Sequence, residues 1–192
     1  MKKIFYPGCR IKRACPVASA RLAEYLEERY HIPAAGCCKK DYTYLDEPDT
    51  TALLICNNCI NDLAKVTANQ KHEYVLDLID RDETFPFPDY QGKRYVLQDC
   101  GHGYGDRPVD QTVRSLLQKM NIDYIEQPAS SRVPYGMPTA EQEKLVKANA
   151  AGFAEEDVIT YCGSCRLWMS QSGKRVVHVL ELLFGGNDQR QE

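Results

Sequence analysis

The sequence predicts an α/β protein made of two similar lobes, each a small and mostly parallel sheet flanked by helices. Three observations lead to this fold class. Short apolar runs typical of strands alternate with longer stretches of helical periodicity. The first half of the chain matches the second half segment by segment, and a C-x-x-C motif follows a strand-like run in each half. An internal duplication explains the last two observations.

The first matching segments are strands that lead into a cysteine. Residues 3–6 run into Pro-Gly-Cys9, and residues 94–98 run into Asp-Cys100. Each is a short apolar run followed by turn-forming residues, which is the pattern of a buried strand. We therefore expect both thiols at the carboxyl ends of strands.

A helix is expected after each of these strands, over residues 16–30 and 108–120. Both begin with proline, whose missing N–H costs nothing in the first turn of a helix. The second half has a further helical stretch over residues 139–153, where the first half has only a turn-rich connection. The two copies are therefore expected to differ by one helix.

The best match between the halves is a strand-like run, a C-x-x-C motif and a helical stretch. The run begins at Thr51 in the first half and at Asp157 in the second. Ligands of parallel sheets gather at the carboxyl ends of the strands, where these motifs fall. The motif cysteines are Cys56 and Cys59 in the first copy and Cys162 and Cys165 in the second.

The duplication also predicts the domain organisation. Residues 1–84 form the first lobe, residues 85–92 are a linker rich in proline and ending in glycine, and residues 93–186 form the second lobe. Residues 187–192 are a short tail, of the kind that frays at chain ends.

Composition and charge exclude several classes of function. The chain has 192 residues, 24 of them basic and 27 acidic, which gives a net charge of −3 and no general attraction to nucleic acid or to an anionic membrane. No apolar run approaches the roughly 20 residues of a membrane span, and the start lacks a signal-peptide pattern. We therefore expect a cytoplasmic protein with reduced thiols, whose nine cysteines are ligands or redox groups rather than disulfides.

Five thiols of the first half predict a chelating site. Five exceed the four that a tetrahedral zinc ion accepts, and adjacent cysteines bind different irons of a cluster more easily than one small ion. These observations favour iron–sulfur chemistry. A zinc site with four cysteines, and buried thiols without a metal, remain alternatives. The five residues are Cys9, Cys37, Cys38, Cys56 and Cys59.

On these motifs the chain resembles the cysteine-rich CCG-domain family, which includes the B-type subunit of heterodisulfide reductase and the iron–sulfur subunits of glycolate and lactate oxidation systems. The first copy has Pro7-Gly8-Cys9, the Cys37-Cys38 pair and Cys56-Asn57-Asn58-Cys59. The second copy has Asp99-Cys100-Gly101-His102 and Cys162-Gly163-Ser164-Cys165, with Ser130 and Ser131 in place of the cysteine pair.

The resemblance implies an iron–sulfur redox protein of the heterodisulfide reductase B type. It would relay electrons or reduce a thiol/disulfide substrate through one [4Fe-4S] cluster, cubane or non-cubane, held by the five first-half cysteines. A ferredoxin-like or flavoprotein subunit would be its redox partner. A second site could form from Cys100, Cys162 and Cys165. Two alternatives remain: a non-catalytic zinc-binding or other metal-binding interaction module, and a cysteine-only thiol–disulfide oxidoreductase.

Basic residues lie within a few positions of the predicted ligands. They could receive an anionic thiol or disulfide substrate, or form a solvated basic edge. Cys15, just before Pro16, is expected to be a surface cysteine at a helix start, and no residue is predicted to be catalytic. The basic residues are Arg10, Lys12, Arg13, Lys39 and Lys40.

Overall fold

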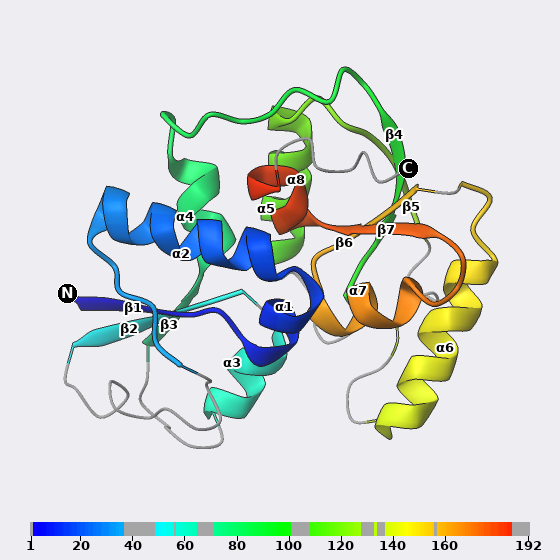
Figure 1. The fold of residues 1–192 in the computed structure, drawn as a ribbon, viewed down its shortest axis with the longest axis horizontal. Coiled ribbons are helices and arrows are strands. Elements are labelled where there is room, and N and C mark those ends of the chain that lie inside the picture. The colour runs from blue at the N-terminus through cyan, green and yellow to red at the C-terminus, as the bar shows by residue number, and fades with distance from the viewer. Residues whose placement is uncertain are drawn as a thin grey trace.

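The structure, a computed structural model, confirms the predicted fold class. Two parallel sheets are flanked by helices, one sheet from each half of the chain (Figure 1). The residues that the structure describes are 2–36, 49–55, 57–64, 71–100, 108–127, 133, 137–155 and 157–185.

The first sheet has three parallel strands in the order β1-β2-β3. These are β1 (Lys2–Tyr6), β2 (Thr50–Leu54) and β3 (Lys71–Tyr74). Strand β2 is buried along its whole length, as expected for a central strand covered on both faces. On its other side, β1 forms a single parallel bridge between Phe5 and Ala34.

The second sheet has four parallel strands in the order β5-β4-β6-β7. They are β4 (Arg94–Gln98), β5 (Asp123–Glu126), β6 (Asp157–Thr160) and β7 (Arg175–His178). The bridge at Ala34 takes the place next to β1 that β5 takes next to β4. The two sheets therefore follow the same plan.

The helices predicted over residues 16–30, 108–120 and 139–153 are all present, and their bounds agree within two residues. The structure has α1 (Cys9–Ala14), α2 (Pro16–Tyr30), α3 (Asn57–Ala64), α4 (Val75–Arg81), α5 (Pro108–Lys119), α6 (Thr139–Ala151), α7 (Gly163–Met169) and α8 (Val179–Phe184).

Three short strands were missed by the sequence interpretation: β3, β5 and β7. Each has four residues, and β3 and β7 pass into a helix without an intervening loop. The apolar run that starts at Val176 therefore spans a strand and a helix, and neither periodicity is sustained for long enough to be recognised. Secondary structure changes at His178, whose side chain and main chain form a capping box with Glu181.

The two halves pack against each other through helices. Helix α1 contacts α7, α2 contacts α8, and α4 contacts α5 (Figure 1). The rings of Tyr25 in α2 and of Phe85 both pack at steep angles against Phe184 of α8, with ring centroids 5.7 and 5.4 Å apart. Between α4 and α5, the Ser115 hydroxyl donates to Asp80 at 2.8 Å. Aromatic contacts and hydrogen bonds thus both join the halves.

The predicted linker, residues 85–92, lies outside every helix and strand, while the exact lobe boundaries stay predictions. Its Tyr90 donates a hydrogen bond to the carbonyl of Leu182 at 2.9 Å, so the connection is itself packed on the second half. Within the described part of the chain, every helix is too short or too polar to serve as a membrane span.

Candidate functional site

Three of the described cysteines, Cys9, Cys100 and Cys162, lie just beyond the carboxyl ends of strands, as the sequence predicts. Cys9 follows β1 and begins α1, and Cys100 follows β4. Cys162 follows β6 and is the residue before α7, which contains Cys165. Among the six described cysteines, Cys9 is exposed and the others are buried.

The turn between β1 and α1 lies against Cys59. Gly8 has a φ of 74°, a left-handed conformation that favours glycine. A β-carbon at this position would lie 3.2 Å from Sγ of Cys59. The structure therefore brings two of the predicted first-half residues, Cys9 and Cys59, to the same turn.

The second-half motif lies against the same turn. A β-carbon on Gly163 would lie 3.0 Å from the carbonyl carbon of Arg10 and 2.9 Å from Cδ1 of Ile11. Gly163 directly follows Cys162, so the C-x-x-C of the second half reaches the start of α1. We call this place, formed by residues 8–11 and 162–163, the α1–α7 contact. No sequence motif indicated that the two halves would meet here.

Basic groups border the α1–α7 contact on the side of the first half. Lys12 and Arg13 are exposed, while Arg10 is partly buried and its guanidinium lies 5.7 Å from the ring centroid of Trp168 in α7. A guanidinium over an indole face is held by a cation–π interaction. Arg10 therefore links the halves as well as adding positive charge beside Cys9.

Several predicted site residues lie outside the described residues. For these residues the predicted convergence on one site stays a prediction. They are Cys37, Cys38 and Cys56 of the first set, Lys39 and Lys40 of the basic group, and Ser130 and Ser131 of the second copy.

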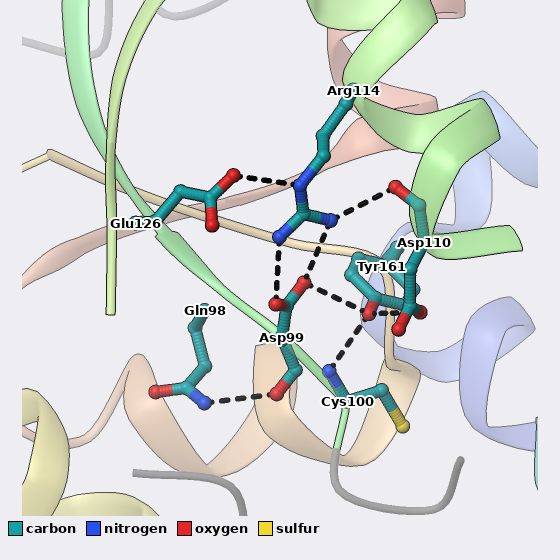
Figure 2. Close-up of polar contacts among 7 residues, drawn as sticks. All are labelled: Gln98, Asp99, Cys100, Asp110, Arg114, Glu126 and Tyr161. Carbon is teal, nitrogen blue, oxygen red and sulfur yellow. Dashed lines mark hydrogen bonds and ion pairs between the residues drawn. The ribbon is translucent and has the colours of Figure 1, made fainter. Parts of the chain in front are cut away.

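A partly buried polar cluster lies next to Cys100 at the end of β4 (Figure 2). Arg114 of α5 makes a two-pronged ion pair with Asp99, with Nη2 2.8 Å from Oδ2 and Nη1 3.3 Å from Oδ1. Its Nε donates to Glu126 of β5 at 2.7 Å. A planar guanidinium matches a carboxylate in this geometry, so Arg114 fixes the position of Asp99.

Tyr161 completes this cluster. Its hydroxyl oxygen accepts a hydrogen bond from the main-chain N–H of Cys100 at 3.0 Å, and it lies 3.0 Å from Asp99 and 2.8 Å from Asp110 (Figure 2). Burial, and then the two carboxylates, raise the pKa of Tyr161 far above its usual range, so the phenol stays neutral. Sequence reasoning missed Tyr161, Asp110 and Arg114 because they come from two other elements.

His178 is a buried residue near the second C-x-x-C. It is fully buried, pairs with Thr160 in the sheet register, and accepts the N–H of Leu180 on Nδ1 at 3.1 Å. Burial is the main cause that lowers the pKa of His178 to about 4, so the imidazole is neutral at pH 7. Because Nδ1 accepts, the proton is on Nε2.

The prediction that Cys15 is a surface cysteine is wrong. Cys15 is 3 % exposed, and its thiol lies 3.5 Å from the carbonyl oxygen of Ile11. Burial raises the pKa of Cys15 to about 12, which keeps the thiol protonated. The chain turns between α1 and α2 at this residue, and that turn directs the side chain into the core rather than to the surface.

The described residues contain no group of three or more His, Cys, Asp or Glu side chains placed to hold a metal ion. Cys100, Cys162 and Cys165, the possible second site, are all among these residues. Tetrahedral and cluster sites need three or four ligands whose donor atoms converge.

No family model and no curated protein matches the chain. Among solved structures it is similar to an aspartate racemase of Picrophilus torridus, with 12 % identity, 95 % of this chain and 90 % of the other covered, and a TM-score of 0.41. A putative Asp/Glu racemase from Yersinia pestis has 8 % identity, 95 % coverage of both chains and a TM-score of 0.35. An aspartate racemase homologue from Pyrococcus horikoshii has 12 % identity, 96 % coverage of both and a TM-score of 0.37. These likenesses are too weak to give this chain an activity.

These findings correct the family assignment and what it implied. Membership of the CCG-domain family is wrong, because no family model matches the chain. The iron–sulfur redox function of the heterodisulfide reductase type is withdrawn with it. So are the [4Fe-4S] cluster and the alternative zinc ion, since the described residues contain no metal-binding group. Thiol spacing alone was a poor guide, because cysteines that serve other purposes also follow strands.

Proposed function

We propose that this chain is a cysteine-dependent enzyme that acts on a small anionic molecule at the α1–α7 contact. Cys9 is the thiol that reaches the substrate. One observation carries the proposal: cysteine motifs from both halves meet at one place, and of the described cysteines there Cys9 alone is exposed. Sites of parallel α/β sheets lie at the carboxyl ends of strands, where this contact lies.

The charge around Cys9 supports an anionic substrate. Lys12 and Arg13 are exposed on α1, and Arg10 adds a third positive group held over Trp168. Positive charge concentrated beside a reactive group raises the local concentration of anions and speeds their association. The whole chain has a net charge of −3, so this basic group is a local exception to an overall excess of acidic residues.

A thiol supports two kinds of chemistry here. It can exchange a proton with a carbon next to a carboxylate, or attack an electrophilic carbon of the substrate. Both need a cysteine that is reachable and fixed in place. Gly8 supports this, since its left-handed turn starts α1 at Cys9. The expected redox partner protein is not part of the proposal.

Proton NMR in D₂O tests the proposal without a coupled assay. The protein is incubated with a panel of small dicarboxylates and acidic amino acids, including aspartate and glutamate, the amino acids named for the compared structures. Loss of an α-proton signal reports proton exchange, and new signals report other turnover. We expect one or more panel members to react with the wild type.

The Cys9→Ala and Cys15→Ala variants form a matched pair for this experiment. Removing a thiol that acts on the substrate lowers the rate by a factor of about 100 or more. Cys15 is buried and donates a hydrogen bond to the carbonyl of Ile11, so its removal should leave the rate unchanged. Equal rates in the two variants contradict the role of Cys9. Failure of every panel member to react contradicts the assignment to small carboxylates.

A further inference from the structure

The basic side chains that follow Cys9 have no acidic partner. Within the described part of the chain, the side chains of Arg10, Lys12 and Arg13 take part in no ion pair and no hydrogen bond. Many basic side chains elsewhere are paired with a carboxylate, so positive charge without a counterion is concentrated on α1. Such pairs include Arg29–Asp82, Arg114–Asp99, Arg166–Glu181 and Arg175–Asp157.

Of the three unpaired residues on α1, Arg10 is the one that other parts of the protein hold in place. Its guanidinium lies over the ring of Trp168 in α7, 5.7 Å from the ring centroid, whereas Lys12 and Arg13 are exposed. The main chain of Arg10 is held as well, because a β-carbon added to Gly163 would lie only 3.0 Å from its carbonyl carbon. Two contacts from the second half therefore restrain Arg10.

The contact with Trp168 does not supply the partner that a guanidinium needs. The attraction to an indole face acts on the positive charge, and it leaves the N–H donors that point away from the ring without an acceptor. Two parallel donors of a guanidinium match the two oxygens of a carboxylate. A carboxylate bound to Arg10 would supply both the missing acceptors and the missing counterion.

We propose that Arg10 is the specificity-determining residue of the α1–α7 contact, where it binds a carboxylate of the substrate while Trp168 positions its guanidinium. This inference rests on the proposed function, because Arg10 directly follows Cys9, the thiol that reaches the substrate. It narrows the substrate class from small anions to carboxylates. Lys12 and Arg13 attract the anion by charge alone.

The fluorescence of Trp168 tests the proposal in the unmodified protein. Trp168 is the only tryptophan of the chain, so the emission reports on this place alone. Titration with succinate should change the emission to a saturating value, because the carboxylate alters the charge over the indole. Succinamide, a neutral molecule of similar size, should have no effect. No saturable change with succinate overturns the proposal, and so does tighter binding of inorganic phosphate, which would assign the site to phosphate esters.

Isothermal titration calorimetry with succinate measures the affinity without relying on the emission of Trp168. Arg10→Lys keeps the charge and removes the paired donors, so the dissociation constant should rise at least about tenfold. Arg13→Lys is the matched control, because it keeps the only property that exposed Arg13 contributes, and its dissociation constant should stay at the wild-type value. Equal effects of the two substitutions contradict a specific role of Arg10. If Arg10→Lys does not fold, the fluorescence titration of the wild type still decides.

The Cys9→Ala variant separates this inference from the proposed function. Binding of a carboxylate to Arg10 does not need the thiol, so Cys9→Ala should bind succinate with wild-type affinity while turnover is lost. Binding of succinate without turnover of any panel member contradicts the proposed function and leaves the carboxylate site in place. For a panel member that reacts, Arg10→Lys should raise KM more than it lowers kcat. An unchanged KM in this variant contradicts the role of Arg10 alone.

Discussion

The ends of β1 and β4 occupy equivalent places in the two sheets but offer different surroundings to their cysteines. Cys9 is exposed and followed by basic residues of α1. Cys100 is 3 % exposed, and the phenol of Tyr161 holds its main chain beside Asp99 and Asp110. The same strand order and the same succession of strand, cysteine and helix thus support an accessible thiol in one half and a restrained thiol in the other.

The comparison shows which features of the duplicated fold determine the chemical surroundings of the two cysteines. Backbone path places a cysteine at the end of a strand in both halves, because strand, turn and helix recur in the same order. Accessibility and charge come instead from side chains of neighbouring elements, such as Arg114 of α5 and Tyr161 after β6. A change in those side chains alters the site and leaves the fold unchanged.

The largest expected difference between the halves is a loss of stability between pH 6.5 and 4 that comes from His178 in the second half. His178 precedes α8, whereas Tyr74 precedes α4 at the matching place. Because the folded pKa of His178 is lowered to about 4, the unfolded chain binds the proton more readily below about pH 6.5. Stability should therefore fall by about 3 kcal/mol as the pH drops from 6.5 to 4.

Urea unfolding at a series of pH values measures this loss. His178→Asn retains a good residue for the start of a helix and removes the titrating group, so its stability should vary less over the same range. The matched variant Tyr74→Asn should keep the wild-type pH dependence. A His178→Asn profile parallel to that of the wild type contradicts the assignment of the effect to His178.

The next effect concerns the close contact of the two halves. Gly163→Ala puts a β-carbon within 3.0 Å of the main chain of Arg10, which must shift, and overpacking of this kind costs about 2 kcal/mol. Gly152→Ala is the control, since its β-carbon would meet nothing nearer than 3.5 Å. Equal stabilities of the two variants in urea unfolding would contradict the close packing of α1 against α7 at Gly163.

A smaller effect is expected from the cation over Trp168. Arg10→Met keeps an apolar stem and removes the guanidinium, which should cost about 0.5 kcal/mol at a partly exposed site. Lys12→Met, on the exposed face of the same helix, should change the stability less. If Lys12→Met costs as much as Arg10→Met, the interaction with the indole contributes nothing specific.

The sequence predicted most of the fold because its signals are local. Proline marks the starts of α2 and α5, and periodicity marks their lengths. The strands it missed, such as β5 and β7, have four residues each, too few to reveal a period of two. Their existence depends on pairing with β4 and β6, which local sequence does not encode.

The site was predicted only in part. Spacing predicted that Cys9 and Cys59 would share one site, and this stays a prediction, because the structure places Cys59 against Gly8, the residue before Cys9. The contact between α1 and α7 depends on how the halves pack, and no sequence motif predicts it. Tyr161 and Asp110, 51 residues apart, meet only through tertiary structure. The chemistry was misassigned because thiol spacing does not distinguish a metal ligand from a reactive or buried cysteine.

Native-state labelling with iodoacetamide, with each cysteine read by mass spectrometry, tests most directly whether Cys9 is the thiol that a small molecule reaches. Cys9 should be modified at least about tenfold faster than Cys15, Cys59, Cys100, Cys162 and Cys165, because each of these is buried. All six should react alike after unfolding in denaturant. If native Cys9 reacts as slowly as Cys15, or if one of the buried thiols reacts first, the account of the α1–α7 contact as the reactive site is contradicted.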